Sequence, residues 1–279
     1  MKTRTLFVLL PALALGNAGC PSSDITLGEA SQAVEETSIA SQASNLAEGS
    51  LELTTSFTLG QAVENAAAEI KGFVTTELPC ANVTVSGATV TIQYGANGDT
   101  CLWHGQQITG THVVTVQKDD MNDVLVHHEW QNVSNGRVEV SGTADVTWSL
   151  SAKTRHVVHS LDWTRLSDHR TGHGTGDRTQ SPLDGDWTQG ILVDGQRTWD
   201  GQAGHWDLDI NQVGWRWEDP VPESGEYVLT TPAQKELTLA FARKDANTIH
   251  VTVTGVKKTF EFDVSKAGDV GSNGSGDGA

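Results

Sequence analysis

A 32-residue repeat constrains the fold of this chain more than any other feature of its sequence. Three segments, Gly110-Thr-His-Val-Val-Thr115, Gly142-Thr-Ala-Asp-Val-Thr147 and Gly174-Thr-Gly-Asp-Arg-Thr179, lie 32 residues apart. A second landmark has the same spacing, since Val126-His127 is followed 32 residues later by Val158-His159. Two landmarks at one period predict repeated hairpins, each with a short return strand, that stack side by side into a sheet.

Apolar and polar residues alternate through most of the chain after residue 82, as around Val90 and Ile92. Such alternation predicts strands with one buried face. Pairs such as Asn135-Gly136 predict tight turns, because both central residues of these turns require positive φ. Strand patterns at intervals of roughly 8–12 residues, with no helical pattern between them, predict a mainly β fold, either an antiparallel meander sheet or an open barrel.

Two helical segments precede the strands. Thr26-Leu-Gly-Glu29 predicts a capping box, but the pattern after it is weakly amphipathic, so residues 20–50 are expected to form a tether that is helical in part. A second helix is predicted over residues 60–75 from apolar residues at helical spacing: Val63, Ala66, Ala67, Ile70, Phe73 and Val74. We expect it to pack on the sheet of a single β-rich domain, residues 51–265, with a disordered tail over residues 266–279.

The N-terminus has the features of an export signal. Lys2 and Arg4 precede an apolar run of about ten residues, which is too short to cross a bilayer. The run ends in Gly16-Asn-Ala-Gly-Cys20, which resembles the lipobox of bacterial lipoproteins. Asn17 departs from the family pattern, which usually has Leu there. A plain secretory signal with an incidental cysteine is the alternative.

The resemblance implies that residues 1–19 are a removed signal peptide and that Cys20 carries a lipid. It further implies a lipid-anchored protein of the cell envelope whose partner is the membrane. Pro21, after the cysteine, favours the outer membrane by the same resemblance. The remainder of the chain is similar to uncharacterised β-rich envelope lipoproteins only in its general strand-rich character.

The other cysteines and the charge agree with export. With Cys20 lipidated, Cys80 and Cys101 remain and are expected to form a disulfide in an oxidising compartment, two free thiols or a metal pair being the alternatives. Removing residues 1–19 deletes two of 18 basic and none of 35 acidic side chains, which takes the formal charge from −17 to −19. Such a charge argues against electrostatic binding to nucleic acid or to anionic lipid.

Candidate metal and phosphate sites in the sequence have simpler structural explanations. The glycines of residues 172–176 lack the following helix that a phosphate loop requires. His127 and His128 would point to opposite faces of a strand, as would His156 and His159, so neither pair can hold one zinc ion. Residues 207–218 resemble a calcium loop without its turn glycine. We therefore expect no metal, no cofactor and no catalytic residues.

Tryptophan supplies the ligand-binding candidates. The chain has nine, and a late group lies beside carboxylates: Trp199, Trp206, Asp207, Asp209, Trp215 and Trp217. Exposed aromatic rings flanked by carboxylates are typical of sugar-binding faces, whereas packing at the rim of the sheet is the favoured alternative. Arg178 and Gln180 stand where the earlier repeats have apolar residues, which predicts a sheet edge or rim and a loss of at most about 1 kcal/mol for Arg178→Ala.

Three functional hypotheses follow. The leading one is a non-enzymatic, membrane-anchored envelope lipoprotein with a binding or structural role and a protein or glycan partner. The second is a carrier of an apolar ligand between helix and sheet. The third is a carbohydrate-binding or glycoside-hydrolysing protein that uses residues 199–219.

Overall fold

The computed structural model describes residues 24–54, 63–96, 100–103, 105–118, 124–149 and 152–276. The helices are α1 (Leu27–Leu53) and α2 (Val63–Glu77), and a short 3-10 turn η1 spans Leu183–Gly185. The strands, in chain order, are β1 (Asn82–Ser86), β2 (Thr89–Tyr94), β3 (Cys101–Trp103), β4 (Gln106–Lys118), β5 (Val124–Ser134), β6 (Val138–Ser149), β7 (Thr154–Arg165), β8 (Arg170–Pro182), β9 (Ile191–Gly201), β10 (Gly204–Trp215), β11 (Ser224–Thr230), β12 (Glu236–Asp245), β13 (Thr248–Thr254), β14 (Thr259–Ser265) and β15 (Val270–Gly276).

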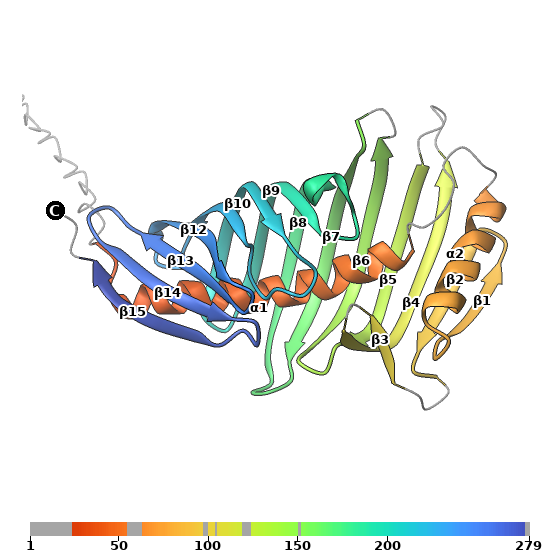
Figure 1. Ribbon diagram of the computed structural model, residues 1–279, viewed down its shortest axis with the longest axis horizontal. Coiled ribbons are helices and arrows are strands. Elements are labelled where there is room, and N and C mark those ends of the chain that lie inside the picture. The colour runs from red at the N-terminus through yellow and green to blue at the C-terminus, as the bar shows by residue number, and fades with distance from the viewer. Residues whose placement is uncertain are drawn as a thin grey trace, which may run out of the picture.

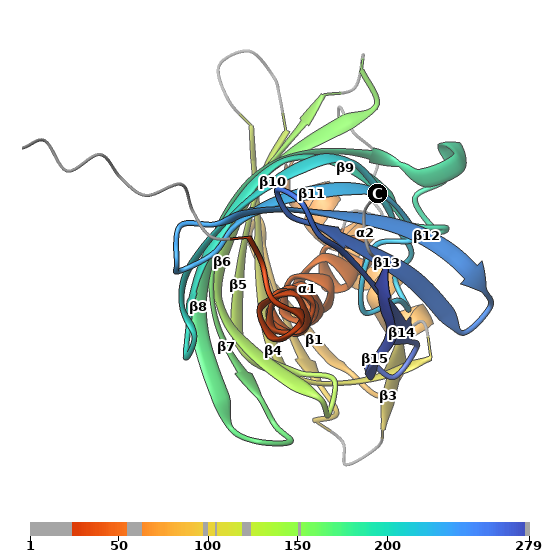
Figure 2. The same cartoon turned by 90° about the vertical axis from the view of Figure 1, so that its left-hand side faces the viewer.

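The strands form one antiparallel sheet in which almost every strand lies beside its neighbours in sequence. The order is β1-β2-β4 and then β5 to β15 in succession, with β3 paired to β4 off this path. The predicted meander is therefore confirmed, and the sheet stays open. It curls along its length around α1, as the end-on view shows (Figures 1 and 2).

The 32-residue repeat corresponds to one hairpin. Gly110, Gly142 and Gly174 lie on β4, β6 and β8, so the units are β4–β5, β6–β7 and β8–β9. The predicted short return strand is wrong, because two strands of 11–13 residues with their turns account for the whole period. Gly142 has a φ of 142°, and a Cβ there would lie 2.2 Å from the Ser160 carbonyl oxygen, so the repeated glycine permits close approach of the next strand.

Helix α1 corrects the prediction of a tether. It fills the trough of the curled sheet and is buried along its length, including small and polar residues such as Ser41, Ser44 and Glu48 (Figure 2). A helix that is covered on all sides needs no apolar stripe, which is why its weak amphipathicity was misleading. The predicted capping box is confirmed, since the Glu29 amide donates to Thr26 Oγ1 at 3.2 Å and the Thr26 amide donates to Glu29 at 2.8 Å.

The two ends of the sheet have different covers. At one end α2 buries Ala66, Ala67, Ile70 and Val74, and the predicted disulfide is confirmed between Cys80, after α2, and Cys101 of β3. At the other end β15 pairs with β14, so the prediction of a disordered tail is wrong for residues 270–276. Edge pairing requires only backbone hydrogen bonds, which a Gly- and Ser-rich segment supplies as well as an apolar one.

Candidate functional site

An open groove of about 600 Å³ lies on the outer face of the sheet. Its main feature is a row of side chains in register across β6 to β9, Ser141, Asp162, His173 and Asp200. His205 of β10 continues this row next to the groove. Alternate residues of a strand point to opposite faces, so all five project away from α1. The groove also exposes the polar side chains of Asn132, Glu139, Thr164, Thr171 and Gln202.

Histidine–aspartate pairs order this row. His173 Nδ1 lies 2.8 Å from Asp162 Oδ1, and His205 Nδ1 lies 2.8 Å from Asp200 Oδ1. The hydrogen bond to Asp200, with help from Asp207, raises the pKa of His205. Among the described residues, no group of three His, Cys, Asp or Glu side chains could hold a metal ion. The groove therefore offers carboxylates, imidazoles, amides and hydroxyls for hydrogen bonding to a polar ligand.

The glycine-rich stretch of β8 forms the floor beneath this row. His173, Thr175 and Asp177 point outward, while the glycines between them point inward. A Cβ on Gly172 would lie 2.2 Å from the Trp163 ring, and one on Gly176 would lie 2.3 Å from His159. The absence of side chains on β8 therefore makes room for large side chains of the neighbouring strands.

Arg178 contradicts the prediction that this stretch is an edge or rim. β8 is a central strand, paired along its length with β7 and β9. Arg178 is 5% exposed and donates to Glu48 of α1 and, at 2.8 Å, to His159. The inward face of β8 is polar at this point because it packs against a polar part of α1.

Arg155 of β7 extends the contact between sheet and helix. Its guanidinium lies 3.5 Å from Glu48 and 3.4 Å from Glu52, and Nε donates to Gln180 at 2.6 Å. The rings of Trp148 and Trp187 lie 5.5 and 4.6 Å from the same guanidinium. Burial raises the pKa of Glu52, against the opposing effect of Arg155.

A second buried chain joins Tyr94, His112 and His128. The Tyr94 hydroxyl and His112 Nδ1 are 3.2 Å apart, and His112 Nε2 and His128 Nδ1 are 3.0 Å apart. Both imidazoles stack with Trp130, whose indole donates to Ser50 of α1 at 2.6 Å. Burial lowers the pKa of His112 to about 3, so the ring is neutral at physiological pH. The predicted split of His127 and His128 between the two faces is confirmed, since His127 pairs outside with Asp145.

The structure does not bring the predicted ligand-binding residues together. The four tryptophans, Trp199, Trp206, Trp215 and Trp217, are each at most 6% exposed. Trp199 and Trp206 stack with centroids 5.8 Å apart, whereas Asp207 and Asp209 point to the outer face. An exposed aromatic platform is therefore wrong for these residues, and their burial agrees with the packing alternative. Strand alternation separates the rings from the carboxylates.

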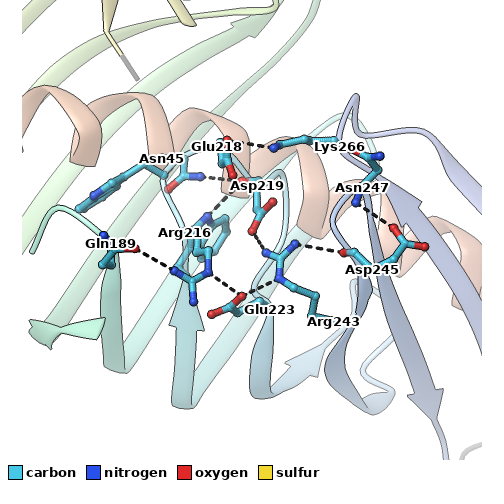
Figure 3. A network of polar contacts seen from close by, with 12 residues as sticks. Asn45, Gln189, Arg216, Glu218, Asp219, Glu223, Arg243, Asp245, Asn247 and Lys266 are labelled. Carbon is cyan, nitrogen blue, oxygen red and sulfur yellow. Dashed lines mark hydrogen bonds and ion pairs between the residues drawn. The ribbon is translucent and has the colours of Figure 1, made fainter. Parts of the chain in front are cut away.

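The connection from β10 to β11 is fixed over α1 by a polar network (Figure 3). Glu223 accepts from Arg216 at 2.9 Å and from Arg243 at 2.6 Å, and Arg243 also pairs with Asp219. Asn45 of α1 donates to the Asp219 carbonyl at 2.7 Å. Burial raises the pKa of Asp219, which Arg243 opposes. These carboxylates serve the packing of α1.

Searches of protein-family models, curated proteins and solved structures found no match to this chain. Of the two helices that the structure describes, neither is long and apolar enough to cross a membrane.

The sequence alone did not reveal the outer groove. Each of its residues occupies an ordinary outward position on a strand, and the row arises only from the register of five strands. Asp162 and His173 are 11 residues apart, yet they lie directly opposite each other on β7 and β8. A search for Asp and His at cross-strand positions of the predicted hairpins would have found this pair.

Proposed function

We propose that this protein is a non-enzymatic lipoprotein of the cell envelope, anchored through a lipid on Cys20, that binds a hydroxyl-rich ligand such as a glycan in the outer groove. The observation that supports binding is the row of paired Asp and His side chains in an open groove of about 600 Å³. Hydroxyl groups can donate to its carboxylates and accept from its imidazoles and amides.

The start of the described chain supports the anchoring. Lys235 Nζ donates to the Asp24 carbonyl at 3.3 Å, and Ile25 is buried beside Gly255 of the β13–β14 turn. Cys20 precedes Asp24 by four residues, so at most about 14 Å of extended chain would separate the lipid from this end.

The same end of the molecule suits a membrane surface. Val256, in the β13–β14 turn, is 72% exposed, and the adjacent Lys257 and Lys258 are exposed as well. Lys235 also lies at this end but pairs with Glu29 at 2.6 Å, so the exposed positive charge there comes from Lys257 and Lys258. In a strongly acidic chain, a local group of lysines around an apolar residue favours contact with anionic lipid headgroups.

The carrier and hydrolase hypotheses have less support. Two cavities between α1 and its neighbours measure only about 20 Å³ each, far below the volume that an apolar ligand occupies. Asp162 and Asp200 share the groove, but both are exposed and hydrogen-bonded to histidines, which is the opposite of the apolar setting that prepares a general acid.

The experiment has two arms. Isothermal titration of the mature domain against a glycan panel should give binding that Asp162→Asn and Asp200→Asn weaken at least tenfold, whereas Asp263→Asn, outside the groove, leaves it unchanged. No measurable binding to any glycan of the panel, or equal binding by all three variants, would refute the ligand class. Mass spectrometry of the N-terminal peptide tests the anchor separately, and an unmodified Cys20 would refute it.

A further inference from the structure

Arg197 of β9 is a buried cation whose hydrogen bonds go to hydroxyl groups. It is 4% exposed and points toward α1, where it donates to Ser44 Oγ at 2.8 Å and to Ser41 Oγ at 3.1 Å. The Tyr227 ring lies 5.9 Å from its guanidinium. Within the described part of the chain, no carboxylate pairs with Arg197, and its Nε has no hydrogen-bond partner.

The surrounding interior has a surplus of positive charge. Three guanidiniums, those of Arg155, Arg178 and Arg197, face α1, while the carboxylates of Glu48 and Glu52 pair with the first two. Burial lowers the pKa of Arg197 to about 10, so it remains charged at neutral pH. An uncompensated buried charge is strongly unfavourable, and a third negative charge would relieve it.

A cavity beside Arg197 has room for such a charge. It measures about 20 Å³ and is bounded by Ser44, Trp163, Gly174 and Trp199 as well as by Arg197 itself. That volume holds one water molecule or one monatomic ion, and excludes phosphate or a carboxylic acid. The neighbouring His159 is neutral, because burial together with Arg178 and Arg197 lowers its pKa.

We propose that this cavity is a binding site for a halide ion, chloride under physiological conditions, held by Arg197 and the Ser44 hydroxyl of α1. A water molecule could satisfy the free N–H but would bring no negative charge, whereas the Glu48 carboxylate, which also raises the pKa of Arg197, is already shared by Arg155 and Arg178. The bound anion would couple β9 to the middle of α1 and stabilise the folded state by mass action. The site lies on the α1 side of the sheet, whereas the outer groove lies on the opposite side, and Trp163 borders both.

The first test compares melting temperatures of the mature protein in sodium chloride and sodium gluconate at equal concentration. Chloride should raise the melting temperature by a few degrees in a saturable manner. Arg197→Met should lose this increment, and Arg137→Met, at an exposed position, should keep it. Equal melting in both salts, as expected if the cavity holds only water, or an increment retained by Arg197→Met, would overturn the proposal.

Bromide provides a second test that does not require the variant to fold. Trp163 and Trp199 border the cavity, so bromide bound there should quench their fluorescence with saturation, whereas random collisions quench buried rings weakly and linearly. Crystals grown in bromide should show an anomalous peak beside Arg197. The absence of that peak would overturn the proposal.

Discussion

Arg178 of β8 donates a hydrogen bond to Glu48 of α1, across 130 residues of sequence and in the interior of the molecule. Glu48 also lies 3.5 Å from Arg155, so one carboxylate of the helix joins two neighbouring strands. The pairing fixes the position of α1 along the trough, because the apolar contacts of its small side chains are less specific than a buried ion pair.

Arg178→Ala should therefore destabilise the protein by about 3–5 kcal/mol, because it leaves Glu48 with one of its two cationic partners and opens a buried space. Urea unfolding of the mature protein measures the change. Arg137→Ala, at an exposed position, should cost less than about 0.5 kcal/mol. A loss below about 1 kcal/mol for Arg178→Ala would contradict the buried pairing.

Gly176→Ala should cost about 1–3 kcal/mol, because the new methyl group would overlap His159 and approach Arg197. Gly72→Ala is the matched control. Gly72 is exposed on α2 with open space around it, so alanine there should stabilise the helix by about 0.5–1 kcal/mol. Equal effects at the two positions would show that β8 is not closely packed against its neighbours.

Stability should fall as the pH drops below about 6.5. The unfolded chain then protonates its histidines, whereas burial holds the pKa of His112 near 3 and lowers that of His128 and His159 in the folded state. Unfolding free energies from urea titrations between pH 7 and pH 5 test the slope. His112→Phe should flatten it, and an unchanged slope in this variant would assign the acid sensitivity to other groups.

His205 should titrate above the usual histidine pKa, because Asp200 and Asp207 stabilise its cationic form. The stability from these exposed pairs is complete below the unfolded pKa and is lost as the pH rises through the folded one. NMR titration of the ring protons should show a lower pKa for His205 in Asp200→Asn. The Asp263→Asn variant should leave the His205 titration in place.

The proposed orientation of the protein on a membrane can be measured with two variants, each of which carries one fluorophore in a different turn. Val256→Cys lies in the β13–β14 turn, which contacts Ile25 just before α1, and Ser86→Cys lies at the end of β1. Strand β1 lies at the opposite end of the sheet from β13 and β14 (Figure 1). With the lipidated protein on vesicles that carry an energy acceptor in their headgroups, transfer should be strong from position 256 and weak from position 86. Equal transfer would refute the orientation, whereas failure to bind vesicles would refute the anchor.

The strand order was predictable because each hairpin is encoded locally, by alternation and by turn residues such as Asn135-Gly136. The role of α1 was not predictable from the sequence, because serines and Glu48 on a helix are typical of a solvated tether. Only the structure shows that arginines of β7, β8 and β9 face these polar side chains. Neither half of this interface indicates burial by itself. Polar residues on a buried helix and arginines on an inward strand face are favourable only because they hydrogen-bond to each other. The outer groove depends in the same way on the register of distant strands.

The position of α1 also bears on the order in which the chain folds. The helix precedes every strand that the structure describes, yet it contacts both the early strands β5 to β7 and the late strands β13 to β15. The trough that encloses it is complete only when β14 and β15 have paired. Folding should therefore begin with the local hairpins and finish when β13 to β15 close over α1.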